Sequence, residues 1–187
     1  MSVLRIHVLG SPILRQPTKP LASVTDEHRK LIDDMVETMY AARGIGLAAP
    51  QVGSDARIAV VDVEGDAPFA IVNPEIVERS EDEERGEEGC LSIPDVYGDV
   101  SRPLRVVVRA LDRDGKPFEL SADGLLARCL QHEIDHLDGR LFVDHLGVLR
   151  RKAAMAKWAT LKGKYPGHIR TLSAEEIAAH HERDDEL

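Results

Sequence analysis

The chain has 187 residues, of which 43% are hydrophobic and 30% are charged, and its formal net charge is -9. Its length allows one substantial core, and the composition is typical of a folded domain rather than a disordered segment. The negative charge argues against a nucleic-acid groove as the main surface, and no apolar run of about 18 residues is present to span a membrane. We therefore expect one cytoplasmic domain with reduced cysteines and no specific DNA or membrane partner.

The N-terminal half predicts a helix followed by two strands. Apolar residues recur at helical spacing over residues 26–42, with Thr25 as a cap and Gly44 after the end. Residues 56–63 and 69–77 are short runs rich in Val and Ile, and Gly, Asp and Pro bound them. These features indicate an amphipathic helix packed on a core that also contains strands.

The next part of the chain predicts a hairpin and a second helix. Residues 104–111 and 116–120 flank the Asp-Gly pair at 114–115, which favours a tight turn because such a turn needs positive φ. Apolar residues then recur at helical spacing over residues 124–137. We therefore expect an antiparallel strand pair followed closely by a helix.

Two more helical segments are expected near the C-terminus. The first, residues 148–161, carries several Arg and Lys side chains, and the second starts at a capping box that begins with Ser173. Residues 180–187 are acidic, and we expect them to fray. Residues 163–187 would then form a C-terminal extension that is partly helical or frayed.

The helix predicted over residues 124–137 contains HEIDH, which has the H-E-x-x-H form. His132 and His136 are four residues apart, so both imidazoles lie on one face and can reach one metal ion. Glu133 lies beside that face, where its carboxylate can exchange a proton with water. An ordinary amphipathic helix is the alternative interpretation. A separate apolar stripe would bury the helix, formed by Leu126, Leu130, Ile134 and Leu137.

A catalytic metal site usually has a third protein ligand and an open position for water. Cys90 is the best candidate, because a thiolate and two imidazoles suit a divalent transition metal. It lies in what we predict to be a loop after a solvated acidic run. Glu175 and Glu176 are the helical carboxylates that a zinc endopeptidase would use instead. Cys129, one turn before His132, is expected to line the cavity rather than to bind metal.

Three motifs together resemble the peptide deformylases, which remove the N-formyl group from nascent polypeptides. They are GIGLAAPQ at 44–51, EGCLS at 88–92 and QHEIDH at 131–136. The resemblance covers about residues 3–162 and implies a single catalytic domain over residues 1–187. It implies an α+β fold in which antiparallel β-strands pack around a central H-E-x-x-H helix, with an N-terminal helix and a C-terminal helical segment.

The resemblance also implies the reaction. Cys90, His132 and His136 would hold one divalent metal ion, with Fe(II) as the native ion and Zn(II), Ni(II) or Co(II) able to occupy the site. Water activated by the metal would attack the formyl carbon of the N-terminal formyl-methionine. Glu133 would act as the general base and would then return the proton to the leaving amine.

Substrate binding follows from the same resemblance. The Gln51 side-chain amide and the Leu91 backbone N–H would donate hydrogen bonds to the oxyanion. The backbone near Gly46 would pair with the extended peptide, where a side chain would block the approach. The methionine pocket would be lined by Ile45, Leu125 and Cys129, for which core packing is the alternative role.

The resemblance assigns supporting roles and also shows departures. Glu88 and Arg102 are expected to form an ion pair that fixes the segment of Cys90, with solvated surface charge as the alternative. Gly86 and Tyr97 stand where relatives often carry an aliphatic residue and an Arg. The substrate preference beyond formyl-methionine therefore stays open.

The implied partners are N-formylated nascent peptides and the ribosome. Some relatives dock on the ribosome through a basic C-terminal helix, whereas this chain has acidic residues over 182–186. The basic stretch 150–164 would be the docking surface here.

Two other functions stay open on these residues. A zinc endopeptidase would take its third ligand from a Glu or His downstream of the helix, whereas an upstream cysteine favours deformylation. A structural zinc site would instead be closed by a fourth ligand, such as Cys129 or His145, and would hold no exchangeable water.

Overall fold

The computed structural model describes residues 2–184 and shows antiparallel sheets together with helices. The helices are α1 (Asp26–Ala41), α2 (Gly124–Leu137), α3 (Val148–Leu161) and α4 (Ala174–Asp184). The strands are β1 (Ile6–His7), β2 (Gly46–Ala48), β3 (Ile58–Val61), β4 (Phe69–Arg79), β5 (Glu83–Cys90), β6 (Ile93–Pro103), β7 (Arg105–Leu111), β8 (Pro117–Asp123) and β9 (Ile169–Arg170). No helix within residues 2–184 is long and apolar enough to cross a membrane.

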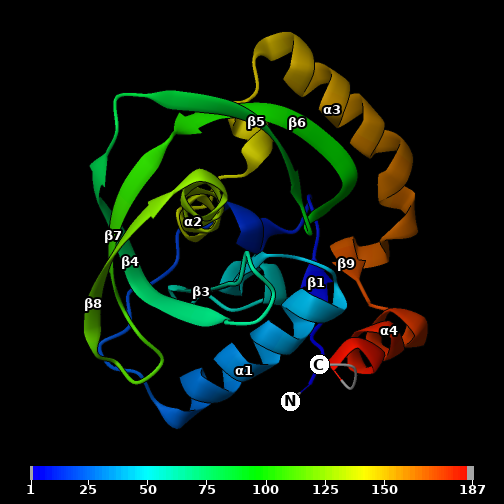
Figure 1. Ribbon diagram of the computed structural model, residues 1–187. Coiled ribbons are helices and arrows are strands. Elements are labelled where there is room, and N and C mark those ends of the chain that lie inside the picture. Colours follow the sequence, from blue (N-terminus) through cyan, green and yellow to red (C-terminus); the bar gives the residue numbers. More distant parts are fainter. Residues whose placement is uncertain (1, 185–187) are drawn as a thin grey trace.

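The strands form three antiparallel sheets around α2. Five strands pair in the order β2-β3-β4-β7-β8, β5 pairs with β6, and β1 pairs with β9. Figure 1 shows α2 end-on at the centre, with β5 and β6 on one side and β3 on the other. The H-E-x-x-H sequence therefore lies on a helix that is enclosed by sheets.

Strand β3 lies between two helices, and its sequence explains how. Successive side chains of a strand point to opposite faces of the sheet. Ile58 and Val60 pack in the cluster that contains the α1 residues, while Ala59 and Val61 pack in the cluster that contains the α2 residues. All four residues are buried, which explains why the strand is a continuous apolar run. The strand separates the part of the core that contains α1 from the part that contains α2.

Helix α2 is oriented by its apolar stripe. Leu130, Ile134 and Leu137 are buried and pack in the same cluster as Ile71 and Val108 of the five-stranded sheet. Because these side chains face the sheet, the histidine face of α2 turns towards β5 and β6. The helix starts directly where β8 ends. This arrangement fixes the two imidazoles relative to the strand that carries the cysteine.

Helix α1 begins and ends at the predicted signals. The Thr25 hydroxyl accepts a hydrogen bond from the His28 N–H, and the His28 ring contacts the Thr25 N–H in return. At the other end Gly44 N–H donates to Met39 O and Arg43 N–H donates to Tyr40 O. The chain then leads into β2, which forms one wall of the site described below.

The acidic run before Cys90 is a strand, so the prediction of a loop there is wrong. Strand β5 pairs with β6 over its length, and this pairing stabilises the strand even though Glu favours strands poorly. Arg85 and Asp99 form an ion pair across the two strands at 2.7 Å. The run is solvated over most of its length, but Glu88, near its end, is buried.

The remaining differences concern boundaries. The strand predicted over 56–63 is shorter (Ile58–Val61), and the second hairpin strand continues to Asp123. The capping box at Ser173 is present, since the Glu176 N–H donates to Ser173 Oγ at 3.1 Å. Helix α4 continues to Asp184, beyond the point where fraying was expected, and residues 185–187 lie outside the described residues.

Candidate active site

Three side chains from β5 and α2 bring their donor atoms together. Cys90 Sγ lies 3.2 Å from His136 Nε2, which lies 3.2 Å from His132 Nε2, and all three donor atoms lie within 4.8 Å of one another. Two imidazole nitrogens bound to one tetrahedral ion would be about 3.3 Å apart. Among the side chains that the structure describes, those of residues 2–179, this is the only group of three or more such donors that could hold a metal ion.

The Glu88 carboxylate orients His132 from behind. His132 Nδ1 lies 3.0 Å from Glu88 Oε2, so Nδ1–H donates to Glu88 and leaves Nε2 as the free donor atom. Arg102 donates to Glu88 through Nε at 2.6 Å and Nη2 at 2.9 Å, and both side chains are buried. Burial alone would raise the pKa of Glu88, but hydrogen bonds from Arg102 and His132 hold it far below its usual value.

Three residues of this network are not among those predicted from the sequence. Asp135 accepts hydrogen bonds from Arg102 Nη1 at 2.8 Å and from His145 Nε2 at 2.7 Å. Burial opposes its ionisation, but His145 and Arg102 lower the pKa of Asp135 to about 2. Arg128 donates to Glu88 at 2.9 Å. A signal was available, because Arg128 and Asp135 lie four residues before and three residues after His132 on the same helix.

Neither residue considered as a fourth zinc ligand belongs to the donor group. Cys129 Sγ lies 3.4 Å from the Ile45 carbonyl oxygen, and burial raises the pKa of its thiol far above the usual value. His145 points its Nε2 at Asp135 instead. A structural zinc site closed by Cys129 or His145 therefore does not match this geometry.

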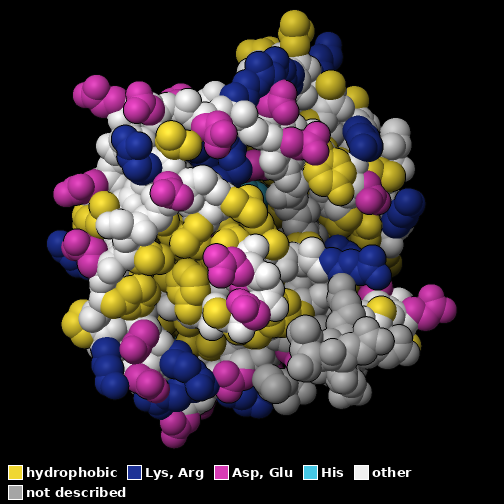
Figure 2. Space-filling view, in the orientation of Figure 1, with side chains coloured by type: hydrophobic (Ala, Val, Ile, Leu, Met, Phe, Trp, Pro, Cys, Tyr) yellow, Lys and Arg dark blue, Asp and Glu magenta, His cyan; other side chains and the backbone are white. Residues whose placement is uncertain are grey.

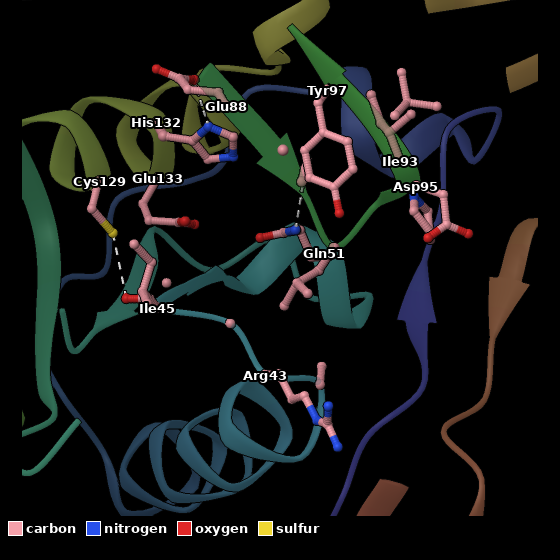
Figure 3. A pocket seen from close by; sticks show the side chains of 18 of the residues that line it. Arg43, Ile45, Gln51, Glu88, Ile93, Asp95, Tyr97, Cys129, His132 and Glu133 are labelled. Carbon is pink, nitrogen blue, oxygen red and sulfur yellow. Dashed lines mark hydrogen bonds and ion pairs between the residues drawn. The ribbon is translucent and has the colours of Figure 1, made fainter. Parts of the chain in front are cut away.

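Two further polar side chains face the donor group from the cleft. Glu133 is buried, and this burial raises the pKa of its carboxyl group to about 7. Gln51 is fixed by the Ala48 N–H, which donates to its Oε1 at 2.8 Å. Its Nε2 therefore points the other way, 3.1 Å from Ser92 Oγ and 3.6 Å from Cys90 Sγ. Figure 3 shows Gln51 and Glu133 on opposite sides of the cavity.

A cleft of about 740 Å³ opens onto this group. Of the twelve site residues predicted from the sequence, all but His136 and Arg102 line it. Ile45 and Leu125 are partly exposed at its mouth, 42% and 54% respectively, so they are not core residues. Figure 2 shows hydrophobic side chains gathered over the middle of the face on which α2 is seen end-on.

Gly46 lies at the closest approach of β2 to α2. A Cβ atom at this position would lie 2.4 Å from Glu133 Oε1 and 2.9 Å from Cys129 Sγ. Such distances do not allow any side chain unless Glu133 moves. The position therefore requires glycine because of close packing, since its backbone φ is not in the left-handed region.

Residues 3–152 match the family model described as polypeptide deformylase. The chain belongs to the polypeptide deformylase family. A peptide deformylase from Mesorhizobium japonicum is 51% identical over 174 residues, which cover 90% of this chain and 99% of that protein. One from Chromohalobacter salexigens is 54% identical over 159 residues, which cover 84% and 94%.

Solved structures of peptide deformylases have the same fold as this chain. The enzyme from Legionella pneumophila has 48% identity and a TM-score of 0.82, with 86% of this chain and 96% of that chain covered. The enzyme from Synechococcus elongatus, in complex with actinonin, has 48% identity and a TM-score of 0.79, with 82% and 86% covered. The resemblance inferred from the three motifs and the expectation of antiparallel sheets with helices are confirmed. The chain is therefore a hydrolase of the family that removes N-formyl groups from nascent peptides.

Proposed function

We propose that this chain removes the N-formyl group from the N-terminal formyl-methionine of nascent polypeptides, with a divalent metal ion held by Cys90, His132 and His136. One observation carries the proposal. The three donor atoms converge at a cleft of about 740 Å³ that is also lined by the buried Glu133. We further propose that residues 3–162 form the core of a single catalytic domain.

The donor set fits a divalent transition metal. One thiolate and two imidazoles suit Fe(II), Zn(II), Ni(II) and Co(II), and we propose Fe(II) as the native ion from the family resemblance. Burial and the neighbouring His132 keep the pKa of His136 well below its usual value, so His136 is neutral and able to donate to a metal. Such an ion supplies Lewis acidity and makes water acidic enough to attack at neutral pH.

Glu133 is suited to move the proton in this reaction. A carboxyl group whose pKa lies near the working pH can both accept a proton and return it. Burial places the pKa of Glu133 at about 7, and its Oε2 has no hydrogen-bond partner among the described residues. Glu133 would take a proton from the attacking water and deliver it to the amine that leaves.

Gln51 and Leu91 would stabilise the charge that develops on the formyl oxygen. The Gln51 amide is held with its N–H₂ group towards Cys90, and the backbone N–H of Leu91 follows that residue directly in the chain. Donors that are already oriented need no reorganisation when the oxyanion forms.

The peptide backbone would pair with the free edge of β2. This strand is the terminal strand of its sheet, so only one edge is paired, with β3. Ile45 O accepts from the Asp62 N–H on the β3 side. Because backbone groups of successive residues alternate in direction, the N–H and C=O of Gly46 point to the cleft. An extended peptide can add there as a further strand.

The methionine side chain would enter the apolar part of the cleft. Ile45, Leu125 and Cys129 line this part. Cys129 contributes a protonated thiol that packs as a small hydrophobic group.

We propose that the protein binds the ribosome through α3. This helix exposes Arg150, Arg151, Lys152 and Lys157 and contains no acidic residue, although the whole chain is acidic. Clustered cations of this kind bind phosphates of RNA in a salt-dependent way. Co-sedimentation with ribosomes should weaken as salt rises and after charge reversal of Arg150 and Lys157. Unchanged sedimentation would rule out this surface.

The proposed reaction is tested with formyl-Met-Ala-Ser and anaerobically purified protein whose metal content is measured. Glu133→Gln should keep the metal and the fold but lower kcat by about 10²- to 10⁴-fold, because it removes the general base. Cys90→Ala should lose the metal. The exposed Glu119→Ala is the control and should do neither. A Cys90→Ala variant that keeps its metal and cleaves casein would favour an endopeptidase instead.

A further inference from the structure

Within residues 2–184, four residues other than glycine have a backbone φ in the left-handed region: Arg43, Asn73, Asp95 and His168. This conformation costs an L-residue roughly 1–2 kcal/mol, and such residues cluster at functional sites. Asn73 has a structural reason, because its side chain hydrogen-bonds to the backbone of Leu21 in both directions at 2.8 Å. Arg43 and Asp95 both line the cleft, whereas His168 does not.

Arg43 occupies a position that glycine would fill without strain. It follows the last residues of α1 at φ 58°, where helices commonly end with glycine. The turn itself is made by backbone bonds, so it does not need an arginine side chain. That side chain is exposed and lines the cleft. The guanidinium group is therefore available to a ligand in the cleft.

Asp95 presents the opposite charge at the same end of the cleft. It lies in β6 at φ 62° with its side chain exposed. In Figure 3 Asp95 lies on the far side of Gln51 from Cys129, and Arg43 lies below Gln51, also away from Cys129. Among the described residues, neither the Arg43 guanidinium nor the Asp95 carboxylate has a hydrogen bond or an ion pair. The other charged pair that lines this end, Arg170 and Glu176, is neutralised internally at 2.8 Å.

The chain from Gly46 back to Arg43 gives a measure of the peptide length. Gly46 lies against Glu133, so the first residue of a substrate would lie beside it. Arg43 lies three residues before Gly46, in the turn that follows α1, so the Cα atoms of the two residues are at most about 11 Å apart. An extended peptide advances about 3.3 Å per residue, so its third and fourth residues lie about 7–10 Å beyond the first. The third and fourth residues of the substrate would then reach Arg43, with Asp95 on the other wall.

We propose that Arg43 and Asp95 are specificity-determining residues that read the charge of the third and fourth residues of the nascent peptide. This inference rests on the proposed function. An acidic side chain at these positions is attracted to Arg43, and a basic one is attracted to Asp95. Because both groups are exposed, each preference is modest, about two- to fivefold, and decreases with salt.

The test compares kcat/KM for formyl-Met-Ala-Ser-Ser with peptides that carry Glu or Lys at position three or four. We expect the wild type to favour Glu over Ser by about two- to fivefold at low salt. Arg43→Gly should bring this ratio to about one without lowering the unfolding midpoint, because glycine relieves the backbone strain. Asp95→Gly should do the same for the preference for Lys.

His168→Gly is the matched control, because it relieves a left-handed residue outside the cleft. It should keep both preferences. Equal Glu-to-Ser ratios in the wild type and in Arg43→Gly would overturn the assignment of Arg43, and equal Lys-to-Ser ratios in Asp95→Gly would overturn that of Asp95. If no formylated peptide releases formate at all, the proposed function itself has failed.

Discussion

Arg102→Met is expected to lower the unfolding free energy by about 3 kcal/mol. Arg102 is buried between the carboxylates of Glu88 and Asp135 and makes three hydrogen bonds to them, between 2.6 and 2.9 Å. The methionine side chain can fill similar space but carries no charge. The two carboxylates would then stay buried without their shared cation.

The size of this loss of unfolding free energy depends on the cations that Glu88 and Asp135 still contact in the variant. Removing one partner of a buried ion pair costs about 3–5 kcal/mol. Glu88 keeps Arg128 at 2.9 Å, and Asp135 keeps His145 at 2.7 Å. These contacts place the loss near the lower end of that range. The weaker hold on His132, through Glu88, should also reduce metal affinity by about 10- to 100-fold.

Urea unfolding followed by the fluorescence of Trp158, the only tryptophan of the chain, measures the loss. Arg109→Met is the control, because Arg109 pairs with Glu119 at 3.2 Å and both side chains are more than half exposed. That variant should lose less than about 1 kcal/mol. If Arg102→Met were no less stable than Arg109→Met, the buried network would not have the role described here.

Three further results are expected. Gly46→Ala should lower kcat/KM by about 10²-fold or more, because its Cβ would displace Glu133, and unchanged kinetics would contradict the packing. Since the fold lowers the pKa of Asp135 to about 2, its stabilisation is complete above about pH 5 and is lost as the pH falls towards 2. In metal-free protein, the difference of about 2 kcal/mol between wild type and Asp135→Asn should therefore shrink over that range, and a constant difference would refute this. Peroxide should inactivate the Fe(II) protein by oxidising the metal and Cys90, and Ni(II) should protect it; equal sensitivity of both forms would count against Fe(II).

The helices are the part of the fold that the sequence predicts best. The bounds predicted for α2 and α3 are those of the structure, because the helical period and the end signals are local. Strands β5 and β6 could not be predicted in this way. Their pairing joins a strand rich in Glu to a partner after a short turn, and cross-strand contacts rather than intrinsic preference stabilise it.

The site was predictable where it depends on spacing along one element. The spacing of His132 and His136 on α2 predicted that the two imidazoles share one face, and the structure also brings Cys90 of β5 next to them. The roles of Arg128 and Asp135 were not found, because their spacing from His132 places them near its face of the helix but does not show which distant charges they contact. Those partners lie far away in the sequence, as in the contact between Arg128 and Glu88, 40 residues apart.

The side-chain repeats of a strand and of a helix explain why Glu88 and Cys90 both contact the imidazoles of His132 and His136. Side chains two residues apart lie on one face of a strand, so Glu88 and Cys90 both point from β5 towards α2. Glu88 reaches Nδ1 of His132, while Cys90 reaches the side on which the Nε2 atoms of His132 and His136 meet. On the helix, the spacing of four presents both imidazoles to that strand. A slip of β5 by one residue would turn Glu88 and Cys90 away together, so the proposed metal site depends on the pairing of β5 with β6.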